Sequence, residues 1–236
     1  MSEWWTYSLA DFLLFSDRVY ERLFELHNRA FWPAHLATIA IGLAILFSSW
    51  PGSSRRTGLR LCFAALGVLW VSVAYAFFWR RYAAINWAAI YVAPFFTVEG
   101  LLLVAFAVAG RFARPKRRSA SVIAGWLLLA FGVIVYPLLA PLSGRPWTGA
   151  GVFGIAPDPT AVATLALLAL TATRAGWPLA VVPALWCVVT GATLWTLGDV
   201  TFFVAPFAAA AAIGVALRGE REMEARPAIP SPRPEP

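Results

Sequence analysis

The stretch that decides the fold is residues 87–109, WAAIYVAPFFTVEGLLLVAFAVA, in which Glu99 is the only charged residue. The hydrocarbon core of a bilayer is about 30 Å thick, and a helix rises about 1.5 Å per residue, so about 20 apolar residues span it. Residues 87–109 meet this length. The sequence therefore predicts a transmembrane helix with one acid near its middle.

Six further runs resemble this one, so we expect an all-α, polytopic transmembrane bundle. The seven runs are 31–50, 59–79, 87–109, 120–142, 160–173, 177–195 and 200–217. The run 160–173 is short for a span, and it suits a tilted span in a thinned bilayer, a buried half-helix or a re-entrant segment. We therefore predict seven spans, with six plus a short or re-entrant fifth segment as the alternative.

Residues 1–30 precede the first span and form a segment of their own. Between Asp17 and Arg29, Val19, Leu23 and Leu26 repeat at helical spacing while most charged residues lie on the other face. This pattern predicts an amphipathic helix in the membrane interface. We accordingly divide the chain into this segment at 1–30, a helical bundle at 31–217 and a Pro-rich tail at 218–236 that we expect to be disordered.

The basic residues predict orientation. The net charge of +7 comes from short clusters between apolar runs, which is typical of a positive-inside membrane protein and not of a nucleic-acid-binding surface. Nine of these residues fall in the connections after runs one, three and five, and only Arg80, Arg81 and Arg145 in the others. We expect the former connections and the C-terminus in the cytoplasm. With arginine replacing lysine almost everywhere, the expected location is a bacterial inner membrane.

Glu99 is the most informative residue, because a charged side chain near the bilayer midplane costs about 2.5–3.5 kcal/mol. One interpretation is a carboxylate that couples or binds a proton, a cation or a substrate. The other is a protonated acid that joins two helices by a hydrogen bond. Pro94 lies five residues earlier, and a kink there would open space beside Glu99.

The predicted topology gathers polar residues in the outer half of the membrane. We hypothesise an outward-facing polar vestibule with Glu99 as its floor and Asp199 near its mouth. Interfacial groups that reach lipid headgroups would give the same pattern. The other candidate pathway residues are His35, Tyr75, Arg80, Arg81, Asn86, Tyr91 and Tyr136.

Catalytic and cofactor motifs are not apparent. HExxH, GxSxG and P-loop patterns are absent, and no lysine in any predicted span offers a retinal Schiff base. Neither cysteine belongs to a CxxC pair, so we predict no metal and no cofactor, and an enzyme ranks third behind the two functions given below. Asp158 and Thr160 flank the start of run five, where we assign helix capping to both in preference to catalysis.

Four stretches resemble an uncharacterised family of bacterial polytopic membrane proteins, a domain of unknown function. They are YSLADFLLFS at 7–16 with FWPA at 31–34, RYAAINW at 81–87, VFGIAPDPT at 152–160, and LWC at 185–187 with GATLW at 191–195. The resemblance covers most of the chain outside the tail. It implies the fold, but no established activity, although members are loosely labelled permeases.

These observations leave two functions open. The first is a small permease or channel-like protein for an ion or small solute, entered from the outer side. The second is a non-transport sensor or scaffold that binds a membrane partner through the basic loop at 111–118 and the N-terminal helix. Ala208, Ala212 and Ala216 form a small-residue face that suits close packing within the chain or in a homo-oligomer. Transport predicts a wet cavity, and a scaffold predicts a dry bundle.

Overall fold

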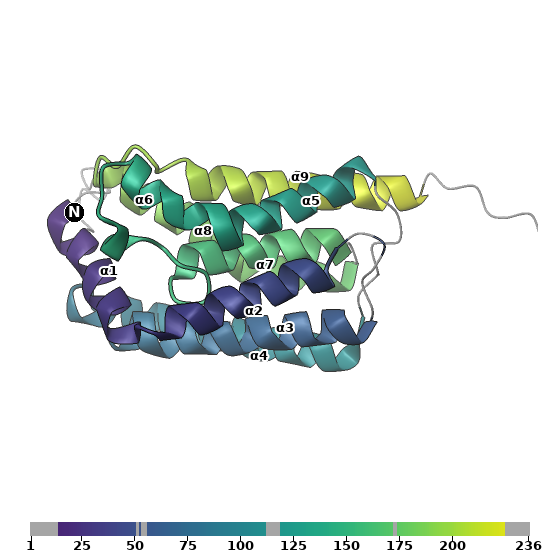
Figure 1. Cartoon of the computed structure of the whole chain (residues 1–236), viewed down its shortest axis with the longest axis horizontal. Coiled ribbons are helices and arrows are strands. Elements are labelled where there is room, and N and C mark those ends of the chain that lie inside the picture. The colour runs from purple at the N-terminus through teal and green to yellow at the C-terminus, as the bar shows by residue number, and fades with distance from the viewer. Residues whose placement is uncertain (1–13, 51, 53–55, 112–118, 172–173, 225–236) are drawn as a thin grey trace, which may run out of the picture.

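The computed structural model describes residues 14–50, 52, 56–111, 119–171 and 174–224, and every regular element among them is helical (Figure 1). The long helices run along the long axis of the molecule, and α1 lies across one end of them. We call this the α1 end. The long helices are α2 (Ala34–Ser48), α3 (Arg56–Val73), α4 (Ala89–Ala109), α5 (Ala120–Ala130), α7 (Pro157–Thr171), α8 (Val181–Thr196) and α9 (Val204–Glu224).

Helix α1 (Asp17–Phe31) is the predicted amphipathic helix, and it meets α2 at a bend of 91°. Its buried face differs from the predicted one. Tyr20, Leu23, Phe24 and His27 pack on the bundle, whereas Val19 and Leu26 are exposed. Ring contacts favour this face, because Tyr20 contacts Tyr82 edge to face and Phe24 contacts Phe77 at a tilt.

Two helices change their winding near the α1 end. Helix α3 continues into a π-helical segment, η3 (Ala74–Trp79), and α5 continues through a π-helical segment, η5 (Phe131–Val135), and a 3₁₀ turn, η6 (Tyr136–Leu138), into α6 (Leu139–Leu142). Pro137 lies in the second break, where its ring and missing N–H prevent regular α-helical bonding. Pro94, in contrast, lies inside an uninterrupted α4.

Helix α7 is the central helix, since all of its 15 residues are buried. It packs against α3, α5, α8 and α9. Of the three alternatives for run five, the structure therefore shows a short, buried helix. The apolar loop before it also turns inward, with Phe153, Ile155 and Ala156 buried.

Helices α3 and α4 approach each other most closely, at a pair of facing glycines. A Cβ atom on Gly67 would lie 2.5 Å from the Gly100 carbonyl oxygen, and one on Gly100 would lie 2.6 Å from the Gly67 carbonyl oxygen. Only glycine permits this backbone contact. The contact places Glu99, the residue before Gly100, deep inside the bundle.

Four helices of the described chain are long and apolar enough to cross a membrane, and a fifth is added if α1 and α2 form one bent span. The predicted count of seven is not reached on these criteria. Helix α7 has only 15 residues, and α9 carries Arg218, Glu220 and Arg221 in its last turns. The chain is thus an all-helical bundle with four or five such helices.

The C-terminal boundary differs from the prediction, because α9 continues through residues 218–224, which the sequence assigned to the disordered tail. Two carboxylates hold this extension. Glu220 accepts a hydrogen bond from the Trp177 indole nitrogen at 2.8 Å, and Glu222 accepts one from the Ser121 hydroxyl at 2.7 Å. The remainder of the predicted tail and most of the basic loop lie outside the described residues.

Candidate functional site

A small polar pocket lies at the α1 end, between α1, the α5–α6 segment, the start of α7 and the end of α8. Its volume is about 30 Å³. A water molecule needs about 10–15 Å³ of such volume, so the pocket has room for two or three waters or a small ion. It is lined by Tyr20, Phe24, Tyr136, Leu139, Ala140, Arg145, Gly149, Gly151, Asp158, Leu194 and Thr201.

Asp158 is the deepest charged residue of this pocket, with 7% of its surface exposed. Its Oδ1 accepts hydrogen bonds from the Trp186 indole nitrogen and the Thr190 hydroxyl, both at 2.7 Å. Trp186 and Thr190 are one turn apart on α8, so both donors point to one side of that helix. The capping role predicted for Asp158 is wrong, because the carboxyl group reaches across to α8.

The start of α7 favours an acid at this position. Asp158 lies in the first turn, where unpaired backbone N–H groups and the helix dipole stabilise negative charge. Thr160 fastens the turn from the inside. Its hydroxyl donates to the Ala156 carbonyl at 2.7 Å and accepts from the Gly154 amide at 2.9 Å.

An ion pair stands beside the pocket. Arg145 lines the pocket, and the Nε atom of Arg145 lies 3.6 Å from Oδ2 of Asp199. Asp199 Oδ1 accepts bonds from the Thr201 amide at 2.7 Å and the Thr201 hydroxyl at 2.6 Å. These bonds hold Asp199 in place, and Asp199 in turn holds Arg145.

Tyrosine side chains form the remaining polar lining. Tyr136 follows the π-helical segment before Pro137 and is buried, and Tyr20 reaches in from α1. Burial and the negative charge of Asp158 hold the pKa of Tyr20 well above its ordinary value. The Tyr20 phenol therefore stays neutral and can donate or accept a hydrogen bond.

The structure brings two of the predicted pathway residues, Tyr136 and Asp199, to this pocket. Tyr75 and Tyr91 lie elsewhere, 60% and 65% exposed on the outside of the bundle. Arg80 is exposed, and Asn86 accepts a bond from the Ala88 amide in the same turn at 3.0 Å. Arg81 lines a groove on the other side of α1.

His35 belongs to a separate polar network that fastens α1 to the loop before α7. Its Nε2 lies 3.3 Å from Oδ1 of Asn28, and the Asn28 amide nitrogen donates to the Thr148 and Ala150 carbonyls at 2.8 and 2.9 Å. His27 Nε2 lies 3.1 Å from the Ile155 carbonyl oxygen. This network is a structural tie that positions the pocket wall at 149–151.

Glu99 is fully buried, and its carboxyl oxygens have no hydrogen-bond partner in the described part of the chain. It is not among the residues that line the pocket. Phe96, one turn before it, packs against Trp70 and Trp186, with ring centroids 4.4 and 5.4 Å apart. Because Trp186 also binds Asp158, an aromatic layer lies between the pocket and the level of Glu99.

The sequence alone pointed less clearly to Asp158, Tyr20 and Arg145. A usable signal was present, because Trp186 and Thr190 place two donors at i and i+4 in an otherwise apolar run, and such donors need an acceptor. Among the described residues, no group of three or more His, Cys, Asp or Glu side chains is arranged to hold a metal ion.

A family model described as a family of unknown function, DUF6064, matches residues 18–226. The chain belongs to this family. The match confirms the resemblance seen in the sequence, and it includes every residue of the pocket. Searches of the curated proteins and of the solved structures give no match. Membership in DUF6064 carries no activity with it, so function is argued from the site.

Proposed function

We propose that this chain is an integral membrane protein of the bacterial inner membrane that takes a proton or a small monovalent cation into the pocket at Asp158 from the outer side. The observation that carries the proposal is a buried carboxyl group, held by two donors, at the bottom of a small pocket. The membrane location and the ligand have separate supports, given in turn.

The apolar exterior supports the membrane location. Large apolar side chains cover the outside of α4, whereas soluble proteins rarely expose such a contiguous surface. Those exposed on α4 are Ile90, Tyr91, Phe95, Val98, Leu101, Leu102 and Val108. Lipid is the solvent that suits this surface, because its tails are as apolar as these side chains.

We infer seven crossings, with α2, α3, α4, α5–α6, α7, α8 and α9 each passing through the bilayer. Helix α7 does not have to meet the length of a lipid-exposed span, because all of its residues are buried by neighbouring helices and none faces lipid. The charged last turns of α9 then extend into the cytoplasm. In this arrangement, the α1 end faces outward, and the arginine-rich connections face inward.

The charge and size of the pocket support a cationic ligand. Asp158 and Arg145 line the pocket, and Asp199 pairs with Arg145 beside it, so the three groups together carry one net negative charge when all are ionised. A volume of about 30 Å³ holds a hydronium or a bare monovalent cation, but not a metabolite. Carboxylate, hydroxyl and water oxygens are suitable ligands for such an ion.

Beneath the pocket, the bundle is closed by packed aromatic rings. An ion could pass only if these rings moved, and otherwise it would stay in the pocket. The rings of Trp70, Phe96 and Trp186 are packed in contact, so passage toward Glu99 requires them to move. A dry, closed layer is what the sensor hypothesis predicts. In that second candidate function, binding at Asp158 changes the packing of α1 on the bundle without transport.

Proteoliposomes containing a pH-sensitive dye, with Na⁺ or K⁺ gradients as separate arms, test the proposal. We expect uptake by the wild type, near-complete loss in Asp158→Asn, and unchanged uptake in the matched surface variant Glu222→Gln. Glu99→Gln tests whether the ion passes the aromatic layer. If it does, this variant also loses uptake, and if it does not, uptake is unchanged. Equal uptake by wild type and Asp158→Asn contradicts the proposal.

The sensor alternative gives a different result in the same material. No flux, combined with a cation- or pH-dependent shift in thermal stability that Asp158→Asn abolishes, supports binding without transport. A wild type with neither flux nor such a shift removes both functions.

A further inference from the structure

We infer that the groove between α1 and the turn after α3 binds the phosphate headgroup and upper acyl chain of an anionic glycerophospholipid. This inference rests on the membrane location proposed above, but not on the cation at Asp158. The groove lies on the side of α1 opposite the polar pocket. Its volume is about 310 Å³, about ten times that of the pocket.

Three arginines from two elements line this groove. Arg18 and Arg22 are one turn apart on α1, and Arg81 follows η3, where its backbone N–H bonds to the Phe77 carbonyl at 3.2 Å. Separation by four residues places Arg18 and Arg22 on one helix face. Three guanidinium groups therefore surround one space.

The positive charge of the groove is only partly neutralised by the protein. Arg22 pairs with Glu25, and no ion pair joins Arg18 or Arg81 to a carboxylate of the described residues. Asp17 and Glu21 also lie on α1, but neither lines the groove. Three guanidinium groups against one carboxylate leave two positive charges for a ligand to neutralise.

The other side chains of the groove are apolar. Val19, Leu26 and Ile85 line it beside the arginines, and Val19 and Leu26 are each 41% exposed. A free phosphate would leave these side chains in contact with water. A lipid matches both the arginines and the apolar side chains of the groove. Its phosphate accepts hydrogen bonds from the guanidinium groups, and its acyl chain covers the apolar wall.

The position of the groove agrees with this ligand. Helix α1 lies across the end of the bundle at 91° to α2, so in the proposed orientation its axis follows the membrane surface. Lipid phosphates occupy that level. The exposed Trp32 directly follows α1 and the exposed Trp87 lies just before α4, as expected of aromatic side chains at an interface.

Reconstitution of the full chain in nanodiscs tests the inference. Phosphatidylcholine discs doped with phosphatidylglycerol are compared by native mass spectrometry for retained lipid. We expect the wild type to retain phosphatidylglycerol at least about tenfold over its share of the disc, and Arg18→Gln/Arg81→Gln to fall below about threefold. Asp158→Asn should keep the wild-type preference, which separates this site from the proposed cation site.

The matched control is Arg29→Gln/Arg80→Gln, which removes the same charge from the same two elements outside the groove. Retained preference in this control supports a specific site. An equal loss in both double variants, or no preference in the wild type, overturns the inference. Displacement of the lipid by soluble glycerol phosphate overturns the choice of lipid over free phosphate. Recovery of the chain without detergent overturns the membrane location and this site together.

Discussion

Two acids are buried in this bundle, and their surroundings differ. Asp158 begins a helix, accepts bonds from Trp186 and Thr190, and lines a polar pocket. Glu99 lies in the middle of α4 beside the tight contact of Gly67 and Gly100, with no partner for either oxygen in the described chain. In the sequence, Glu99 stood out because it is the only charged residue in the apolar run 87–109. Donors and a helix N-terminus hold the carboxyl group of Asp158 in place, and the cavity beside it makes Asp158 the better candidate for binding a ligand.

The difference has a physical basis. A buried carboxylate is stabilised by hydrogen-bond donors and dipoles aimed at it, and it is destabilised when these are missing. Asp158 has both kinds of support, with two side-chain donors from α8 and a place in the first turn of α7. Glu99 has no hydrogen-bond partner among the described residues. The hypothesis that Glu99 joins two helices by a hydrogen bond is therefore less well supported, because no second helix supplies a partner.

The first prediction concerns the helix contact beside Glu99 and has the largest expected effect. In Gly100→Val, the new Cβ would lie 2.6 Å from the Gly67 carbonyl oxygen and 2.7 Å from a Val71 methyl group. Helices α3 and α4 would have to separate, at a cost of about 3 kcal/mol or more. Thermal unfolding in detergent measures this loss.

Gly214→Ala is the control for Gly100→Val, because a Cβ atom on Gly214 meets nothing within 4 Å. Alanine in an open helical position should leave stability unchanged or raise it by up to about 1 kcal/mol. A Gly100→Val protein as stable as this control would mean that α3 and α4 do not touch, and that Glu99 is less enclosed than described.

The second prediction tests the network that fastens α1 to the wall of the polar pocket. Burial lowers the pKa of His27 from 6.5 to about 4, with smaller contributions from Arg81 and His35. Above pH 6.5, the ring is neutral in both states. As the pH falls from 6.5 to 4, the unfolded chain binds the proton first, so about 3 kcal/mol of stability is lost.

Unfolding midpoints measured between pH 7 and pH 4 check this dependence. His27 lies outside the proposed crossings, so the bulk pH reaches it. The variant His27→Gln should be less stable at pH 7 and should show a flatter profile over the same interval. A wild-type profile as flat as that of the variant would contradict the neutral, buried His27 on which the pocket wall depends.

The third prediction compares the two acids directly and has the smallest effect. Asp158→Asn weakens two hydrogen bonds to a charged acceptor and should cost about 1–2 kcal/mol. Glu99→Leu replaces an unpartnered polar group with an apolar one of similar size, and it should raise stability by about 1 kcal/mol. The opposite signs, read as shifts of the unfolding midpoint, are the result of interest. Equal losses would show that Glu99 has a partner after all.

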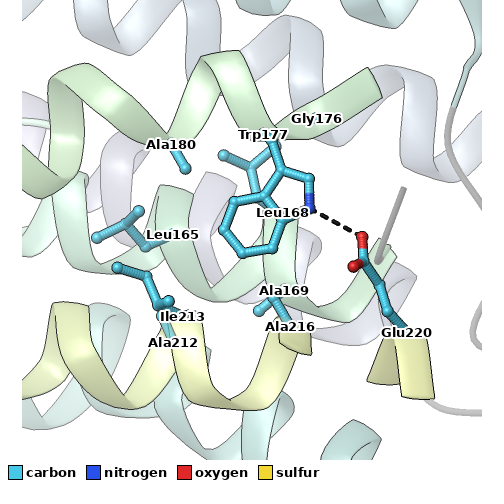
Figure 2. Close-up of a pocket in the computed structure, with 10 residues that line it drawn as sticks. All are labelled: Leu165, Leu168, Ala169, Gly176, Trp177, Ala180, Ala212, Ile213, Ala216 and Glu220. Carbon is cyan, nitrogen blue, oxygen red and sulfur yellow. Dashed lines mark hydrogen bonds between the residues drawn. The ribbon is translucent and has the colours of Figure 1, made fainter. Parts of the chain in front are cut away.

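A further contact marks the other end of the molecule. Figure 2 shows the Trp177 indole lying over Leu168 and Ala169 of α7 and Ala216 of α9, with its N–H bonded to Glu220. Of the predicted small-residue face, Ala208 and Ala212 are buried within the chain and Ala216 is half-buried, on a helix that packs against α5, α7 and α8. Close packing inside one subunit thus accounts for that pattern. These residues line a second pocket of about 20 Å³, which is smaller than the Asp158 pocket.

Much of the helix layout was predictable, because helical apolar runs and their breaks are local properties of a chain. The run at 87–109 became α4, and the run at 120–142 became α5 through α6 with its break at Pro137. The site was less predictable. Tyr136 and Asp199 were named in advance, but Tyr20, Arg145 and Asp158 come from three other segments, and no local pattern records that these meet.

The sequence by itself determined an all-helical chain, the approximate ends of its helices and the segregation of basic residues, because hydrophobic length and charge act on each segment separately. Only the tertiary structure decided which helix is central, which face of α1 is buried and which acid finds donors. Those properties depend on distances between segments remote in the chain. Two buried acids therefore differ in their hydrogen-bond partners through the residues that packing brings beside them.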